Sequence, residues 1–191
     1  KSYWGAQLPV NVGRFNADTI RFDYYRDATV ALEAFKAGDY DFRLENTSKT
    51  WSTGYDSPAL KKGYFRKVEI RHQNPTGMQA FVFNTRKKIF QNPIVREALA
   101  FAFDFQWTNK NLFYGQYART NSFFSNSELA SSGLPSNSEL KILKPLKNKI
   151  PPKVFTQTYY PPRTDGTGRI RKQLREARNL LQRAGWVVRD G

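Results

Sequence analysis

The apolar residues change their period twice in an early stretch of this chain. They alternate with polar residues over 20–24 and again over 40–45, which predicts two half-buried strands. Between these stretches, residues 28–37 carry an apolar stripe at helical spacing, with Asp27 placed as the N-cap and Gly38 as the stop. A strand, a helix and a strand in this order predict a βαβ unit with a parallel strand pair. The fold class we expect is therefore α/β.

A second group of elements is predicted after residue 62. Residues 63–84 have the composition of one or two strands, interrupted at 74–77 by a proline and a glycine that predict a chain reversal or a crossover between sheets. Asn92 is placed to cap a helix that begins at Pro93. A further helix is expected over 104–113, after a break.

The last third of the chain divides into two parts. Residues 134–165 are rich in Pro, Ser and Lys, and we expect mostly irregular, extended chain there. A closing helix is predicted over 170–184, ended by Gly185, with a short strand over 186–188.

The residue inventory argues against an enzyme. The chain of 191 residues has no Cys, which excludes disulfides, thiolate zinc sites and Cys nucleophiles. Its one histidine, His72, has no motif around it that would support a catalytic or metal-binding role. Asp39 and Asp41 are interpreted as solvated turn acids beside a helix end. We expect no catalytic residues, no cofactor and no metal.

Aromatic residues are crowded between residues 81 and 124, among Ala, Leu and Val at core spacings. We expect most of them to be core residues, and a few to form the wall of a ligand pocket. Stacking of nucleic-acid bases is the competing use, but it requires aromatics exposed among Lys and Arg.

The net charge of +15 raises the possibility of a nucleic-acid partner. One dense cluster of basic residues wraps around the polar side of the predicted closing helix, which favours a solvated helix face. A basic nucleic-acid-binding module remains the alternative reading, and its mark would be an affinity that falls steeply with salt. The cluster comprises Arg169, Arg171, Lys172, Arg175, Arg178 and Arg183.

The chain begins with KSYWG, and residues 35–41 contain FKAGDYD. These motifs resemble those of the family 5 extracellular solute-binding proteins, the oligopeptide-binding components of ABC importers, in which the second motif reads F-x-AG-E/D-x-D. Residues 83–104 match the family's most specific signature, a strand with FN followed by F-x-D/N-x-x-V-R-x-A-L-x-x-A-x-D. Asn92 stands where Asp is usual, and either residue caps a helix. ARNLLQRAGW, residues 177–186, resembles a third family phrase, and residues 103–135 resemble the YejA-like subgroup.

The resemblance implies a two-lobed periplasmic binding protein of type II, the Venus-flytrap architecture, with mixed β-sheets and flanking helices. Residues 1–75 would belong to the first lobe and 76–191 to the start of the second, with a hinge crossing at 74–77. The implied function is capture of oligopeptides or peptide-like solutes in the cleft between the lobes, for delivery to ABC transporter permease subunits. The chain looks like an internal fragment of a longer periplasmic parent with a cleaved leader. No membrane span is expected, because no apolar run is long enough.

One candidate group of site residues comes from the predicted strand order. In open α/β sheets, ligands bind beyond the carboxyl ends of the strands, and here that position is the loop from Glu45 to Trp51. Its alternative role is a capping loop into a helix near Ser57. The candidates in this loop are Glu45, Asn46, Thr47 and Trp51.

A second group follows the first helices of the second lobe, where the resemblance places the cleft: Arg119, Asn121 and Ser122. We hypothesise that Arg119 meets a ligand carboxylate and that Glu45 meets a cationic group. The alternative is that Arg119 pairs with an acid inside its lobe and Glu45 with a neighbouring base.

Overall fold

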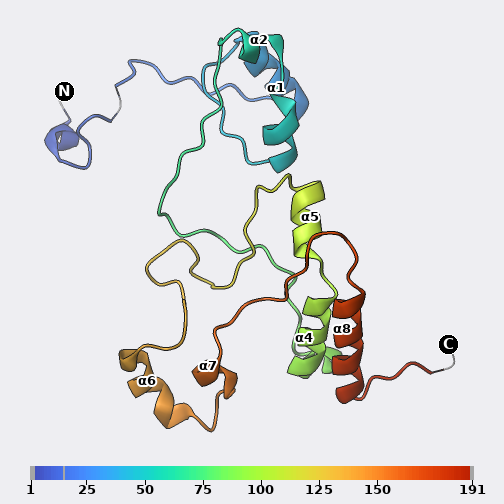
Figure 1. Cartoon of the computed structure of the whole chain (residues 1–191). Coiled ribbons are helices and arrows are strands. Elements are labelled where there is room, and N and C mark those ends of the chain that lie inside the picture. Colours follow the sequence, from blue (N-terminus) through green and yellow to red (C-terminus); the bar gives the residue numbers. More distant parts are fainter. Residues whose placement is uncertain (1–2, 15, 190–191) are drawn as a thin grey trace. The chain divides into compact units, whose positions relative to one another are not determined.

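The computed structural model describes residues 3–14 and 16–189, and its described residues fold into helices joined by extended chain (Figure 1). Two compact units are present, the first formed by residues up to 45 with 54–66, and the second by residues 46–53 with those from 67 onward. The helices are η1 (Trp4–Gln7), α1 (Ala28–Ala37), η2 (Thr50–Gly54), α2 (Pro58–Lys61), α3 (Lys88–Gln91), α4 (Pro93–Phe101), α5 (Phe105–Leu112), α6 (Asn137–Leu143), η3 (Lys144–Leu146), α7 (Lys153–Thr156) and α8 (Arg171–Arg183).

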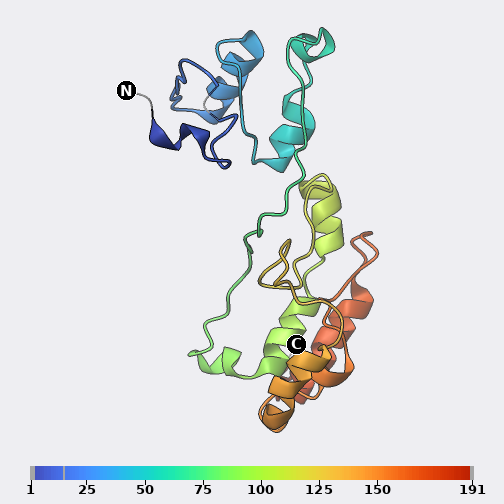
Figure 2. The same cartoon turned by 90° about the vertical axis from the view of Figure 1, so that its left-hand side faces the viewer.

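The core of the second unit lies between α4 and α8, which run side by side in both views (Figure 1, Figure 2). Ala98 of α4 is only 1% exposed, and it packs against Ala177 and Leu180 of α8. The small side chains let the two helices approach closely, while larger apolar residues close the sides of the contact. Those flanking residues are Ile94, Phe101 and Leu181. Of the apolar stripe predicted for the closing helix, Ala177, Leu180 and Leu181 are confirmed as a core face, whereas Leu174 is 47% exposed.

The start of α4 follows the sequence prediction. The Asn92 side-chain oxygen accepts a hydrogen bond from the Ile94 N–H at 2.9 Å, and Pro93 occupies the first turn, where its missing N–H costs nothing. Arg96 donates to the carbonyls of Phe90 (2.6 Å) and Gln91 (3.0 Å), which lie at the end of α3. These two hydrogen bonds satisfy carbonyls at the C-terminal end of α3, which have no donor within that short helix.

In the first unit, α1 also has its predicted ends. The Asp27 carboxylate accepts from the N–H groups of Thr29 (2.7 Å) and Val30 (3.1 Å), and these bonds lower its pKa. Gly38 ends the helix at φ 90°, in the left-handed region that favours glycine. Phe35 then packs on a group of aromatic rings with centroid distances of 5.1–6.1 Å, formed by Tyr40, Tyr55 and Phe65.

The predicted strands are not formed in the part of the chain that the structure describes. The stretches 20–24, 40–45, 63–84 and 186–188 are irregular or extended chain without a ladder partner. Phe22 is 75% exposed, so its apolar face is not buried against anything. A strand needs a second strand to satisfy its backbone groups, and alternation supplies only the side-chain pattern. The structure thus shows the helices of the expected α/β class, and the mixed sheets stay a prediction.

Over 42–45 the alternation survives, but its faces are reversed. Phe42 is 78% exposed, whereas the side chains of Arg43 and Glu45 are only 17% and 6% exposed. In this structure the polar side chains of the stretch are the ones that find partners inside the unit.

Two further expectations need correction. Most aromatics between 81 and 124 were expected in the core, yet Phe81 and Phe123 are more than four-fifths exposed, because the helices there are short and only α4 is covered by another helix. Residues 134–165 were expected to be mostly irregular, but α6 forms within them. Ser136 and Glu139 make a capping box at its start, a sequence signal that the composition of the stretch obscured.

The segment predicted as a hinge crossing is tied to a distant loop of the second unit. Asn126 donates through its side-chain amide to the carbonyls of His72 (3.0 Å) and Asn74 (2.8 Å), and the Thr76 N–H donates to the Ser125 carbonyl (3.0 Å). The predicted lobes, 1–75 and 76–191, remain a prediction, because the division into compact units is not a test of lobe boundaries or of lobe closure. Among the described residues, no helix is long and apolar enough to cross a membrane.

Candidate functional site

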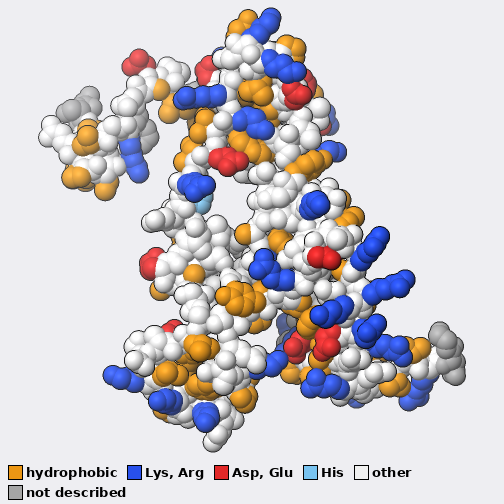
Figure 3. All heavy atoms as spheres, viewed as in Figure 1, with side chains coloured by type: hydrophobic (Ala, Val, Ile, Leu, Met, Phe, Trp, Pro, Cys, Tyr) orange, Lys and Arg blue, Asp and Glu red, His pale blue; other side chains and the backbone are white. Residues whose placement is uncertain are grey.

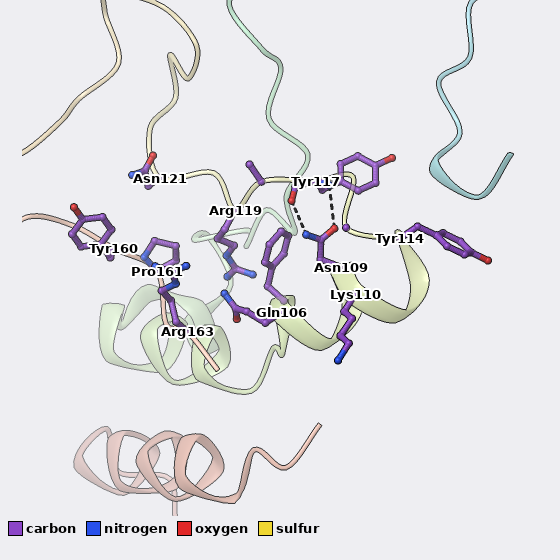
Figure 4. A pocket seen from close by; sticks show the side chains of 13 residues that line it. Gln106, Asn109, Lys110, Tyr114, Tyr117, Arg119, Asn121, Tyr160, Pro161 and Arg163 are labelled. Atoms are coloured by element: carbon purple, nitrogen blue, oxygen red, sulfur yellow. Dashed lines mark hydrogen bonds between the residues drawn. The ribbon is translucent and has the colours of Figure 1, made fainter. Parts of the chain in front are cut away.

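The second unit contains a cavity of about 820 Å³, formed by α5, the loop that follows it and residues 160–163 (Figure 4). This volume lies in the range of about 300–1,000 Å³ that is usual for small-molecule sites. Its lining mixes aromatic rings, side-chain amides and cations. All of the lining residues belong to this one compact unit.

The position of α5 is set by Asp104. Its Oδ1 accepts a hydrogen bond from the Trp107 N–H at 3.0 Å, which caps the helix as the predicted break at this residue requires. The same oxygen accepts from the Thr164 hydroxyl, and the Thr164 N–H donates to Gln106 Oε1 at 3.0 Å. These bonds join α5 to the chain that forms the far wall of the cavity.

The loop after α5 is tethered back onto the helix. Asn109 donates to the Tyr117 carbonyl at 2.7 Å and accepts from the Tyr117 N–H at 3.1 Å, as the dashed lines of Figure 4 show. Tyr114 (φ 55°) and Gly115 (φ 74°) make the turn that allows this return. The tether delivers Arg119, two residues later, to the cavity. Sequence reasoning missed Asn109, although an Asn on the last turn of a predicted helix before Tyr-Gly was a usable signal.

Arg119 is the central cation of the cavity. Its guanidinium carbon lies 5.0 Å from the centre of the Phe103 ring and 5.3 Å from that of Phe105. Burial lowers the pKa of the Arg119 guanidinium from its ordinary value, and the Tyr159 phenol partly offsets this effect. Across residues 3–14 and 16–189, its N–H groups find no hydrogen-bond acceptor and no carboxylate partner. The alternative in which Arg119 pairs with an acid is therefore not what the described residues show.

The charge of the lining is of one sign. Lys110 and Arg163 line the cavity together with Arg119, and no Asp or Glu among the described residues does so. Figure 4 shows the Arg119 side chain directed into the group beside Gln106, whereas the Lys110 ammonium points away from it. The cavity can thus offer a cation with free N–H donors, aromatic surface and amide groups to an anionic or polar ligand.

One polar atom at the start of α5 lacks a partner among the described residues. Asp104 Oδ2 is buried, and no hydrogen-bond donor of the described residues reaches it. The other oxygen of this carboxylate holds Trp107 and Thr164, so Asp104 serves the architecture of α5. Gly168, at φ 79°, permits the close approach of its loop to this helix, since a Cβ there would lie 3.0 Å from the Trp107 ring.

The structure places the predicted residues of the second group in two different settings. Arg119 and Asn121 both line the cavity. Ser122 is buried at 7% exposure, and its hydroxyl oxygen accepts from the N–H groups of Phe124 (3.3 Å) and Ser131 (3.1 Å). Ser122 therefore holds the loop together here. Ligand contact by any of the three stays a prediction.

In the first group, Glu45 lies in the first unit and has local partners. Its Oε2 accepts from the Tyr55 hydroxyl at 3.0 Å and lies 3.4 Å from Arg43 Nη2. Burial, together with the bond to Glu45, raises the pKa of Tyr55 to about 12. Burial by itself would lower the pKa of Arg43, but hydrogen bonds with Tyr40 and Tyr55 outweigh it, so the pKa is raised. Glu45 paired with a neighbouring base is the alternative weighed from the sequence.

The other three residues of that loop belong to the second unit. The Lys67 ammonium lies 4.5 Å from the centre of the Trp51 ring, and it also donates to the Trp51 carbonyl. Asn46 and Thr47 are exposed just before η2. None of these three described residues lines the cavity around Arg119.

Two observations concern the expected absence of metal and catalytic centres. Within the described ranges, no group of three or more His, Asp or Glu side chains could hold a metal ion. His72 accepts a hydrogen bond at Nδ1 from the Asn74 N–H at 3.2 Å, which is a local turn contact.

Comparison with known proteins places this chain in a family. The family model described as "Bacterial extracellular solute-binding proteins, family 5 Middle" matches residues 1–191. The chain is 47% identical over 189 residues to "Uncharacterized protein YejA" of Escherichia coli K12, covering 99% of this chain and 31% of that protein. It is 48% identical over 189 residues to "Probable peptide-binding protein YejA" of Agrobacterium fabrum, covering 98% and 31%.

A third relative is named for a different ligand. The chain is 38% identical over 197 residues to "Peptidoglycan-binding protein YepA" of Agrobacterium fabrum, covering 99% of this chain and 32% of the relative. The chain thus spans about a third of the length of the curated relatives it matches. Since the family model covers the whole chain, the chain belongs to the family 5 bacterial extracellular solute-binding proteins.

Proposed function

We propose that this chain is part of the substrate-binding component of an ABC importer, and that it captures oligopeptides or peptide-like solutes. Its family binds solutes and is not enzymatic, in agreement with the expectation that the chain is not an enzyme. The observation that carries the proposal is the half-buried Arg119, which faces a cavity of about 820 Å³ without an acceptor among the described residues. Two relatives are named as a probable peptide-binding protein and a peptidoglycan-binding protein, which supports peptides or peptide-like solutes as the ligand class.

The proposed binding mode uses the chemistry of the lining. A peptide presents backbone N–H and C=O groups at regular intervals, and the amides of Gln106, Asn109 and Asn121 can donate to or accept from them. The aromatic rings can cover apolar side chains without selecting a particular sequence. Arg119 then supplies the one strong, charge-assisted contact.

Delivery to a transporter requires a change that permease subunits can recognise. We propose that ligand stabilises a closed arrangement of two lobes, divided near residues 74–77, because the ligand contacts both lobes only in that state. Such a protein would work in the periplasm, and its family is extracellular. Glu45, Asn46, Thr47 and Trp51 remain proposed ligand contacts from the first candidate group.

A thermal-unfolding titration tests the proposal. The protein is heated with a pool of peptides of about three to eight residues at physiological salt. A ligand present at 100 times its dissociation constant should stabilise the folded state by about 2.7 kcal/mol. A peptide-dependent rise in the unfolding midpoint that persists at higher salt is the expected result, and no rise with any peptide would contradict the proposal.

A DNA oligonucleotide serves as the rival ligand in the same experiment. The exposed arginines of α8, such as Arg171, Arg175 and Arg178, are the specific observation that favours it, and Figure 3 shows Lys and Arg gathered over that part of the surface. Non-specific nucleic-acid binding would give a shift that disappears as salt rises. A shift with DNA alone would overturn the peptide proposal and make α8 the site.

A further inference from the structure

The cavity around Arg119 has the chemistry of a selective subsite rather than of a general peptide groove. We infer that it selects ligands that bring a carboxylate to Arg119, and that it discriminates against ligands with a neutral or cationic group at that place. This inference rests on the proposed function and adds the ligand class that the site prefers. Its first support is the position of the guanidinium, held on two aromatic rings at 5.0 and 5.3 Å from their centres.

The second support is the unsatisfied state of this guanidinium. Arginine has five N–H donors in a planar fork, and buried donors normally find acceptors. The described residues offer Arg119 none, although it is partly removed from water. A carboxylate accepts two parallel N–H bonds from this fork, so it supplies in one group what the cavity lacks. A neutral amide offers one acceptor oxygen in place of two, so it cannot match the fork, and it brings no opposite charge.

The third support is the charge of the neighbours. Arg163 and Lys110 lie in the same lining, and their side chains make no ion pair within the described ranges. The acid next to the lining, Asp104, is engaged through Oδ1 by Trp107 and Thr164. A cationic ligand group placed beside Arg119 would therefore meet like charges without a carboxylate to offset them.

The preference for a carboxylate should persist at high salt, because the Phe103 and Phe105 rings partly shield Arg119 from solvent. Exposed charges more than about 8 Å apart are largely screened at physiological ionic strength, whereas partly buried pairs are screened much less. The net charge of +15 attracts any acidic peptide at long range, and that attraction disappears with salt. Selection by the cavity is distinguished from it by persistence at high salt and by dependence on Arg119 alone.

Calorimetric titration of the protein with four matched tetrapeptides tests the inference. The probes are Ala-Ala-Ala-Glu, the same peptide with an amidated C-terminus, Ala-Ala-Ala-Gln, and Ala-Ala-Ala-Lys with an amidated C-terminus, which is the one peptide without a carboxylate. We expect the peptides with a carboxylate available to Arg119 to bind at least about tenfold more tightly than the amidated Ala-Ala-Ala-Lys, which equals about 1.4 kcal/mol. Loss of affinity on amidation identifies the C-terminal carboxylate as the group bound, and loss on the Glu-to-Gln change identifies the side chain.

Three variants assign the effect to this site. Arg119→Gln should reduce the preference to near unity while the weaker binding of the amidated Ala-Ala-Ala-Lys is kept, and Arg119→Lys should restore part of it, because lysine retains the charge but not the fork. The matched control is Arg86→Gln, an exposed arginine of the same unit that removes the same charge and should leave the preference unchanged.

The stability of the variants separates a ligand contact from a structural residue. Because Arg119 is desolvated without an acceptor, Arg119→Gln should leave the unfolding midpoint of the ligand-free protein unchanged or raised. A lowered midpoint together with a retained peptide preference overturns the inference. Equal affinity of the wild type for all four peptides also overturns it while the proposed function stands, whereas no binding of any peptide overturns both.

Discussion

The paired helices α4 and α8 and the extended stretches 20–24 and 40–45 carry equally clear apolar patterns, yet only the helices bury theirs. Leu180 is 4% exposed in its contact with α4, whereas Phe22 and Phe42 are 75% and 78% exposed. The helices complete their backbone hydrogen bonds internally, so each needs only one apolar face from a neighbour. The stretches need both a hydrogen-bonding partner and a covering layer. The same strength of pattern therefore has different consequences in the two regions.

Amide hydrogen exchange gives the largest expected difference between the two regions. Amides in the middle of α4 and α8 should be protected on the order of 10³-fold or more, because exchange there requires loss of the helix pair. Amides of 20–24 and 40–45 should exchange almost as fast as in an unfolded peptide. Mass spectrometry of peptic fragments measures both. Strong protection of the two stretches would break the comparison and would support the predicted mixed sheet.

The next effect concerns the helix contact itself. Leu180→Ala should lower the free energy of unfolding by about 2–5 kcal/mol, because it leaves a cavity against Ala98 and Ala177. Chemical denaturation followed by circular dichroism measures the loss. Leu174→Ala is the control on the same helix, because Leu174 is 47% exposed and should change stability by less than about 0.5 kcal/mol. Equal losses for the two variants would mean that α8 is not held through this face.

A smaller effect is expected at the start of α4. Asn92→Ala should cost about 1 kcal/mol, because the Ile94 N–H loses its acceptor. Asn92→Asp should restore stability, since aspartate caps as well. The same denaturation experiment compares the variants, and an unchanged midpoint for Asn92→Ala would show that the cap is not needed once α8 is packed.

Tyr55, which contacts Arg43 and Glu45, should ionise late at alkaline pH. The pKa of Tyr55 is raised to about 12, so its contribution to stability is complete below the ordinary tyrosine pKa near 10 and is lost as pH rises through 12. Ultraviolet absorbance of the phenolate follows this directly, with Tyr55→Phe as the variant that removes the late transition. Ionisation of all tyrosines near pH 10 would show that the contact with Glu45 and Arg43 does not persist in solution.

A second contrast lies between two arginines, and it bears on the site. Arg43 has its donors occupied by Tyr40 and Tyr55 (3.1 Å each) and by Glu45, whereas Arg119 rests on two rings with no acceptor among the described residues. Both are partly buried, so burial alone does not mark a site. The difference is that the environment of Arg43 is complete and that of Arg119 lacks an acceptor, which is why the ligand proposals rest on Arg119.

Helix ends could be predicted from the sequence, because the hydrogen bonds of a helix and its caps are made within a few residues of chain. Asp27 and Gly38 delimit α1, Asn92 and Pro93 start α4, and Gly185 follows α8, all as predicted. These features depend on residues a few positions apart, so the sequence contains all of the information. The signature motif placed the chain in its family for the same reason, since it is a set of short-range spacings.

The candidate site was only partly readable. Arg119 and Asn121 were singled out by resemblance, and the structure places both in the cavity, but Ser122 is turned into its own loop. Gln106 and Thr164 were missed, because a contact across 58 residues has no local signature. Asn109 was missed although its contact with Tyr117 spans only eight residues.

The sequence by itself determined the helix ends, the apolar stripe of α8, the net charge and the family. Only the tertiary structure decided which face of 40–45 is buried, which arginine is left without an acceptor and which loops enclose the cavity. The physical reason is that caps and stripes are satisfied within a few residues of chain. Burial, charge pairing and cavity shape depend instead on which distant segments come into contact.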